Sequence, residues 1–404
     1  MSTSLTKQLE RCLEGVVLGP PLFDPAGLLP CMVVYPLFPS QLGADPPTTI
    51  TLAEGLSRGV RLRDTGQVDR VHVDNPLKAS ILVGESEVLI GETQTRALQI
   101  SCLIPPGQRA SIPVNCVEER RLTAYQAEFT QADICPWNLR SFKLEQLARH
   151  GETHQHRIWD RIETFLDHAE TASPTADLRA AYGTHSFDLN ALRHRYPMHP
   201  GQCGAVCAVG QELYLELFGA PELLEDRYAH LLKSALIEAV VGPQEQVTAP
   251  EVVHAFLAAL PAAGRASRLV HPASLKGKGR SAVFSTSSIT GTALMADQEL
   301  IHLCAHQRCW GKTQAFPLVR PQLEQACADW EGGAFMEMLE REYRPRRLRY
   351  DAFKDRLDPA APPEAPDAGN RLAVLTTDRD PRSPPPRPLA PALYRFFLRL
   401  FQQR

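Results

Sequence analysis

The segment 71–119 constrains the fold more than any other part of the chain, because apolar runs and turn residues alternate within it every few positions. Runs such as ASILVG and SEVLIG are rich in the branched side chains that favour strands. Glycines and prolines, among them Gly84, Gly91 and Pro105, separate these runs and indicate turns. The pattern from 59 to 117 predicts a layer of short antiparallel strands, as in a sandwich or barrel.

The spacing of apolar residues changes after this layer. Between 138 and 197 they recur three and four positions apart, as Ile158 and Ile162 do, which indicates helices. The run CGAVCAVGQELYLELF then predicts a hairpin, Pro221 opens a further helix, and a last group of strands follows. The sequence therefore predicts an α+β fold: a β-sandwich-like core with an inserted helical subdomain at 138–197, within one domain over 5–343.

The composition shifts beyond this domain. Residues 355–391 are rich in proline, aspartate and arginine, which predicts a flexible or polyproline-like linker. Residues 392–404 read ALYRFFLRLFQQR, and a helix there would carry apolar side chains on one side and arginines towards the other. Such an amphipathic C-terminal helix could dock into a partner's groove, fold back onto its own domain, or lie at a membrane surface.

Bulk composition limits the partners and the setting. A net charge of -3 over 404 residues gives no whole-molecule attraction to nucleic acid. No stretch approaches the roughly 20 apolar residues of a membrane-spanning helix. The first residues lack the apolar core of a secretory signal, and the 10 cysteines are scattered, as is typical of reduced thiols. We therefore expect a cytoplasmic protein without a transmembrane segment.

A group of polar residues in the β-rich segment has no obvious role in an apolar core. In a functional interpretation, Arg96 and Gln94 bind a ligand, with Arg96 gripping a phosphate or carboxylate. Glu85 or Glu118 would act as a general base or hold a ribose hydroxyl. In a structural interpretation, Arg96 pairs with a glutamate and Gln94 satisfies backbone groups. Cys116 is a further candidate nucleophile, although no histidine lies near it in sequence and buried packing is the commoner role of cysteine.

Histidines and cysteines near residue 305 have the ligand types that zinc prefers. Their spacing, H-x-C-x-H-x-x-C, matches no standard zinc motif, and a strand there would place alternate residues on one face. We therefore expect no metal site at His302, Cys304, His306 and Cys309. A second group, His150, His154 and His156, is expected on a solvated helix face.

Several motifs of the chain occur in the order of a known family. They are the short helix Leu52–Glu54, Asn75, Gly84-Glu85, Gly91 with Gln94 and Arg96, Pro105-Pro106, Pro113–Glu118, Leu139-Arg140, Gln155 with Trp159, Ser173 with Thr175, Gly204–Phe218 and Ile301–Leu303. Over roughly residues 12–306, the chain resembles the ADP-ribosylglycohydrolase- and rhodanese-phosphatase-superfamily-associated domain family. The resemblance implies association with enzymes that process NAD or ADP-ribose, in stress or defence systems.

Three functions are consistent with these features. The first is an accessory, ligand-binding protein with a nucleotide or ADP-ribose-like ligand. The second is a hydrolase or transferase that acts on a phosphorylated ribose or nucleotide through Glu85, Arg96 and Glu118. The third is a scaffold that recruits a protein partner through 392–404. The chain has no G-x-S-x-G, H-E-x-x-H or dinucleotide-binding motif, which favours a non-catalytic or weakly catalytic protein without excluding an enzyme, and the sequence names no cofactor.

Overall fold

The computed structural model describes residues 5–24, 26–41, 45, 47–64, 67–91, 94–120, 129–242, 248–270, 279–308 and 334–357. These residues form a mixed arrangement of helices and sheets, which confirms the expected combination of α and β structure. Among them, no helix is both long enough and apolar enough to cross a membrane.

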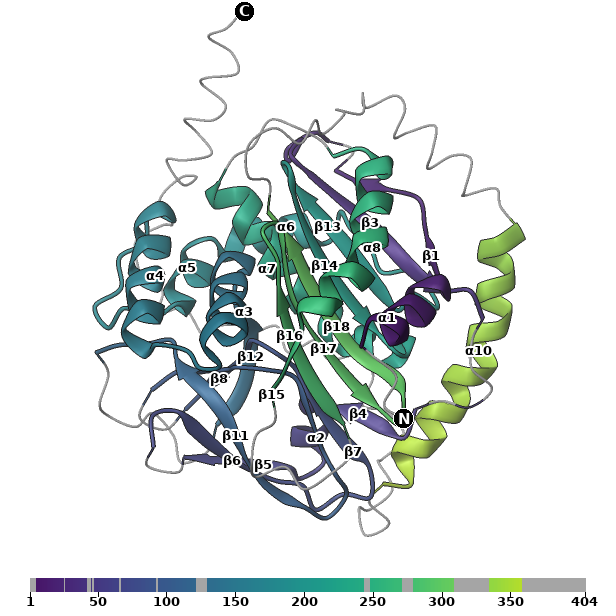
Figure 1. Ribbon diagram of the computed structural model, residues 1–404, viewed down its shortest axis with the longest axis horizontal. Coiled ribbons are helices and arrows are strands. Elements are labelled where there is room, and N and C mark those ends of the chain that lie inside the picture. The colour runs from purple at the N-terminus through teal and green to yellow at the C-terminus, as the bar shows by residue number, and fades with distance from the viewer. Residues whose placement is uncertain are drawn as a thin grey trace, which may run out of the picture. The chain divides into compact units, whose positions relative to one another are not determined.

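A curled, nine-stranded antiparallel sheet forms the centre of the fold (Figure 1). Its middle strands β13 (Gly204–Val209) and β14 (Glu212–Phe218) make the predicted hairpin. The strand order is β1-β3-β13-β14-β18-β17-β16-β15, with β2 beside β3. The other strands are β1 (Val16–Leu18), β2 (Leu22–Phe23), β3 (Met32–Pro39), β15 (Arg268–Val270), β16 (Arg280–Ser285), β17 (Ile289–Ala296) and β18 (Glu299–Gln307).

Helices cover both faces of this sheet (Figure 1). On one face, α1 (Leu5–Glu14) and α8 (Pro250–Ala263) pack against alternate residues of the strands and form an apolar core. On the other face lie α3 (Trp137–His150) and α7 (Pro221–Val241), which share a second core with the sheet. Strand residues therefore alternate between two buried environments, and a polar residue on either face needs a buried partner.

Two smaller sheets form from the β-rich segment 59–117 together with one strand before it and one strand after it. One has the order β10-β7-β4 and the other β12-β8-β9-β11-β6-β5. The pairs are antiparallel except for β4 and β7, which run parallel; β4 precedes the segment 59–117 for which antiparallel strands are predicted. The strands are β4 (Thr49–Thr51), β5 (Arg61–Asp64), β6 (Arg70–Asp74), β7 (Ser80–Val83), β8 (Glu87–Ile90), β9 (Arg96–Leu98), β10 (Cys102–Ile104), β11 (Arg109–Cys116) and β12 (Thr130–Ile134).

The helical segment after β12 contains α3, the equally long α4, and two shorter helices. Ile158 and Ile162 of α4 face the same core as α3 and α7, as their spacing predicts. The bounds are α4 (Gln155–His168), α5 (Arg179–Thr184) and α6 (Ser186–Arg193).

The last described helix, α10 (Ala334–Asp355), packs against the smaller sheets. Its Tyr350 is buried in their core, and Arg346 bonds to Glu222 of α7 at 2.8 Å. The helix thus continues past residue 343. Residues 358–404 lie outside the described residues, and the linker and C-terminal helix predicted there stay predictions.

Candidate functional site

The hairpin β13–β14 and strand β18 carry an unusual set of buried polar residues. In β14, Glu212, Tyr214 and Glu216 alternate with leucines, and in β18, His302, Cys304 and His306 alternate with Leu303 and Ala305. The register pairs Tyr214 with His306. Because side chains alternate along a strand, all these polar groups face α3 and α7.

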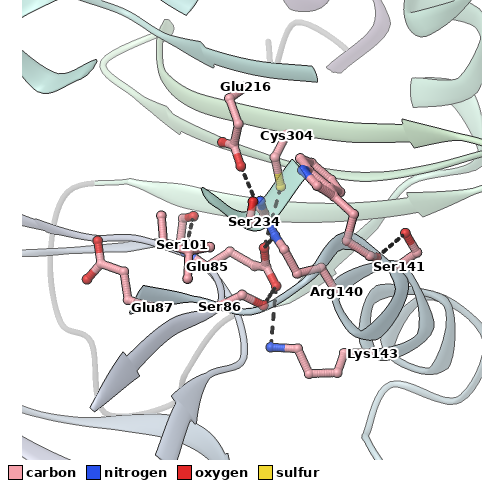
Figure 2. A network of polar contacts seen from close by, with 12 residues as sticks. Glu85, Ser86, Glu87, Ser101, Arg140, Ser141, Lys143, Glu216, Ser234 and Cys304 are labelled. Carbon is pink, nitrogen blue, oxygen red and sulfur yellow. Dashed lines mark hydrogen bonds and ion pairs between the residues drawn. The ribbon is translucent and has the colours of Figure 1, made fainter. Parts of the chain in front are cut away.

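Glu85 reaches this face from the turn between β7 and β8. Its carboxylate accepts a hydrogen bond from Arg140 Nε at 2.8 Å and lies 3.4 Å from Lys143 Nζ. Figure 2 shows the carboxylate between these two cations of α3, with the Ser86 hydroxyl beside it. The side chains of Glu85, Arg140 and Lys143 are 0% exposed.

Hydrogen bonds and one ion pair join these residues into a closed ring, which we call the buried polar ring (Glu85, Ser101, Arg140, Glu216 and His302). Arg140 pairs with Glu216, and Glu216 Oε2 lies 2.6 Å from His302 Nε2. The Ser101 hydroxyl lies 2.7 Å from His302 Nδ1 and accepts from the Glu85 backbone N–H at 2.8 Å. One consistent proton arrangement follows: His302 donates from Nε2 to Glu216, and Ser101 donates to Nδ1.

Electrostatics keep two members of the ring charged and one neutral. Burial alone would raise the pKa of the Glu85 carboxyl, but Arg140 and Lys143 outweigh it and hold the pKa below its ordinary value. Burial would lower the pKa of Arg140, but Glu216 and Glu85 outweigh it and raise the pKa. Burial lowers the pKa of His302, and Glu216 offsets only part of that effect. The ring therefore holds ionised Glu85 and Arg140 beside a neutral imidazole.

A second buried ion pair, Arg227 of α7 with Glu87 of β8, lies next to the ring. Burial lowers the pKa of Arg227 to about 10, so the guanidinium stays charged at neutral pH. Its guanidinium rests against the backbone of Gly84, where a Cβ would meet Arg227 atoms at 2.3 Å. The glycine before Glu85 thus makes room for this cation.

Two aromatic side chains, Trp137 of α3 and Tyr214 of β14, pack beside the buried polar ring. The Arg140 guanidinium lies 3.8 Å from the centre of the Trp137 ring, which stacks on Tyr214 at 5.2 Å. A cavity of about 10 Å³ beside Glu216 is lined by these two aromatic residues, among others. Such a volume suits a single water molecule.

The other four candidate residues lie on β9, β11 and the segments next to them, where they form a strand-edge cluster (Gln94, Arg96, Cys116 and Glu118). Arg96 pairs in register with Cys116 and lies 2.9 Å from its Sγ. The thiol lies 2.8 Å from Gln94 Oε1. Arg96 also pairs with Asp64 at 3.6 Å and bonds the Val68 carbonyl.

Burial and hydrogen bonding restrain the reactivity of the strand-edge cluster. Burial raises the pKa of the Cys116 thiol to about 11, although Arg96 opposes this, so the thiolate is scarce at neutral pH. Glu118 Oε2 accepts from both the backbone and the hydroxyl of Thr95, each at 3.0 Å. Gln94 Nε2 donates to the carbonyls of Glu118 and Glu119.

The predicted site residues therefore occupy two places. Glu85 has its partners on α3 and the large sheet, whereas the other four bond to one another and to neighbouring strands. The sequence did not single out Arg140 or Glu216 as members of a site. Alternating polar residues inside the apolar runs ELYLELF and ELIHLCAHQ are the signal that could have found Glu216.

The histidines considered for zinc bond to carboxylates of β14 instead. His302 bonds to Glu216, and His306 Nε2 lies 2.8 Å from Glu212 Oε2. Cys304 donates to Glu85 at 3.8 Å, and Leu303 faces the opposite core, as the strand alternation predicts. Cys309 lies outside the described residues.

A family model matches residues 28–306, and its description is ARG and Rhodanese-Phosphatase-superfamily-associated Protein domain, ARPP-1. The chain belongs to this family. No curated protein and no solved structure gives a significant match. Glu85, Arg140 and His302, which lie in three separate motifs of the ARPP-1 resemblance, meet in the buried polar ring.

Proposed function

We propose that this ARPP-1 protein is a non-catalytic accessory protein that binds an ADP-ribose-like nucleotide in the cytoplasm. One observation carries the non-catalytic part of the proposal: each candidate catalytic group is buried and held by internal partners. Glu85 is ionised between two cations, Glu118 is bonded to Thr95, and the Cys116 thiol has a raised pKa. A general base or nucleophile has to reach its substrate in an active protonation state.

The ligand class in this proposal comes from the family. The family description names the domain as one associated with the ARG and rhodanese-phosphatase superfamilies. NAD and ADP-ribose are our extension of that association. Gln94, Arg96 and Glu85 stay proposed ligand-binding positions, and binding there would require each side chain to exchange an internal partner for the ligand.

The experiment pairs a binding measurement with a product measurement on the full chain. ADP-ribose, NAD and a nucleoside without phosphate are titrated by calorimetry, and the same mixtures are then analysed by chromatography. We expect saturable binding of ADP-ribose and no product, because a binding protein stabilises its ligand complex without turnover. Product formation that is lost in a still-folded Glu118→Gln variant would overturn the proposal in favour of a hydrolase or transferase.

Absence of nucleotide binding would also overturn the proposal. In that case, capture of a protein partner that depends on residues 392–404 would identify the scaffold function instead. The matching variant ends after residue 391, so that the described domain is unchanged and only the predicted C-terminal helix is removed.

A further inference from the structure

A cleft opens between the end of α3 and the start of α4, away from the buried polar ring. These two helices lie side by side (Figure 1). The cleft has a volume of about 110 Å³, far more than one water requires. Its lining residues are Phe142, Glu145, Gln146, Arg149, His150 and Arg157.

Gln146 supplies an unpaired donor to this cleft. Its side chain lies in the wall, and the residue is only 4% exposed. Gln146 Oε1 accepts from the His154 backbone N–H at 2.8 Å, which assigns the oxygen to that side of the amide. Among the described residues, Nε2 has no hydrogen-bond partner. A buried amide donor without an acceptor is unfavourable, so this group favours a ligand that brings an oxygen.

The charges around the cleft favour an anion. Arg149, His150 and Arg157 are exposed at its rim. Glu145 is the carboxylate among the lining residues, and it is bridged by Arg149 at 2.5 Å and by Arg308 at 3.3 Å. Two guanidinium groups thus offset its charge, and Arg157 and Gln146 line the cleft in addition.

A neighbouring arginine and the helix start add to this positive field. Burial, followed by the charge of Arg308, lowers the pKa of Arg161, whose guanidinium lies 5.8 Å from the centre of the Phe142 ring. Helix α4 begins at Gln155, has no acidic residue in its first turn and has no side-chain cap at His154. The start of a helix carries partial positive charge and exposes N–H groups, which anions bind.

We propose that this cleft binds a phosphate group of a small phosphorylated ligand. Gln146 Nε2 would donate a hydrogen bond to a phosphate oxygen, while Arg149 and Arg157 supply charge-assisted bonds. This inference adds a phosphate site to the proposed nucleotide binding. It rests on that proposed function only for the part of the ligand other than the phosphate group.

Calorimetric titration of the full chain with inorganic phosphate, pyrophosphate and ADP-ribose tests the site. We expect pyrophosphate to bind more tightly than phosphate, and Arg157→Gln to weaken both by about tenfold, as for the loss of one charge-assisted bond. Gln146→Leu removes the buried donor and should weaken binding similarly. The matched control is Arg109→Gln, which changes an arginine of β11 whose side chain is 85% exposed.

The outcomes separate the cleft from the proposed function. Pyrophosphate binding that is weakened about tenfold in Arg157→Gln and unchanged in Arg109→Gln supports a phosphate site in the cleft, even when ADP-ribose does not bind and the proposed nucleotide function fails. If the wild-type protein binds neither phosphate nor pyrophosphate, the proposed phosphate site is wrong. It is also wrong if Arg157→Gln and Arg109→Gln weaken pyrophosphate binding equally. ADP-ribose binding that survives in Arg157→Gln and is lost in a folded Arg96→Gln variant also overturns it, and places the ligand at the strand-edge cluster.

Discussion

Replacing Glu85 by glutamine tests whether the buried polar ring supports the fold. The amide keeps the shape of the carboxylate but removes its charge, so Arg140 and Lys143 lose the counter-charge they share. Removing one partner of a buried ion pair destabilises a protein by about 3–5 kcal/mol. For the unit Met1–Pro359, an unfolding entropy of about 2.1 cal/mol/K per residue turns this into a melting temperature lower by roughly 4–7 °C.

Urea unfolding followed by circular dichroism at pH 7.5 measures this loss. The matched control is Glu163→Gln, because Glu163 forms a surface pair with Arg120 at 3.1 Å and its side chain is 59% exposed. Exposed pairs contribute little, so the control should change the free energy of unfolding by no more than about 1 kcal/mol.

Equal stability of the Glu85→Gln and Glu163→Gln variants would refute the reasoning. The double variant Glu85→Gln/Arg140→Met shows whether the loss of stability in Glu85→Gln arises from its interaction with Arg140. If the two residues interact as described, the double loss differs from the sum of the single losses by about 0.5–3 kcal/mol. Additive losses would show that Glu85 and Arg140 act independently.

Two further predictions concern a titrating carboxyl and a glycine. Burial raises the pKa of Glu238, which accepts from the Asn138 N–H at the start of α3, to about 7. At this carboxyl the folded state therefore holds a proton that the unfolded state has lost between about pH 4.5 and 7, and the contribution of Glu238 to stability falls as pH rises through that window. Glu238→Gln should remove this contribution, so that the variant gains about 1–3 kcal/mol relative to wild type at pH 8 but not at pH 4.5, as pH-dependent unfolding would show. Gly84→Ala should cost about 1–3 kcal/mol in urea unfolding, because the new methyl group meets Arg227. Gly183→Ala, in a helix with open space around the position, should be neutral or stabilising, and an equal effect of both would contradict the contact.

Local features of the fold followed from the sequence because the signals lie within a few residues. The hairpin at 204–218 and the helix that starts at Pro221 are examples. Thr51 is the N-cap of the short helix α2 (Leu52–Ser57), and its hydroxyl accepts from the Glu54 N–H at 3.3 Å, as in a capping box of the T-x-x-E type. In a complete capping box the glutamate carboxylate reaches back to the helix start, but the Glu54 carboxylate bonds to Arg58 and to Lys354 of α10. A sequence pattern that spans four residues cannot show that Lys354, 300 residues away, competes for the Glu54 carboxylate.

The buried polar ring could not be predicted for the same physical reason. Its members come from a turn of the small sheets, from α3 and from β14 and β18, and only the folded topology brings them together. The sequence does indicate that Glu85 and nearby polar residues have no obvious role in an apolar core. It does not indicate the partners of Glu85, because nothing in the sequence near Glu85 specifies the arginine of α3 that neutralises it.

Helix α10 has a consequence for where this domain can be cut. The family match ends at residue 306, whereas Tyr350 and Leu357 are 1% and 4% exposed within the core of the small sheets. A fragment that stops at residue 306 would leave that core open to water and would unpair Glu222 from Arg346. Limited proteolysis should therefore yield a resistant fragment that retains α10, and excision of the domain for study should keep the chain through Leu357.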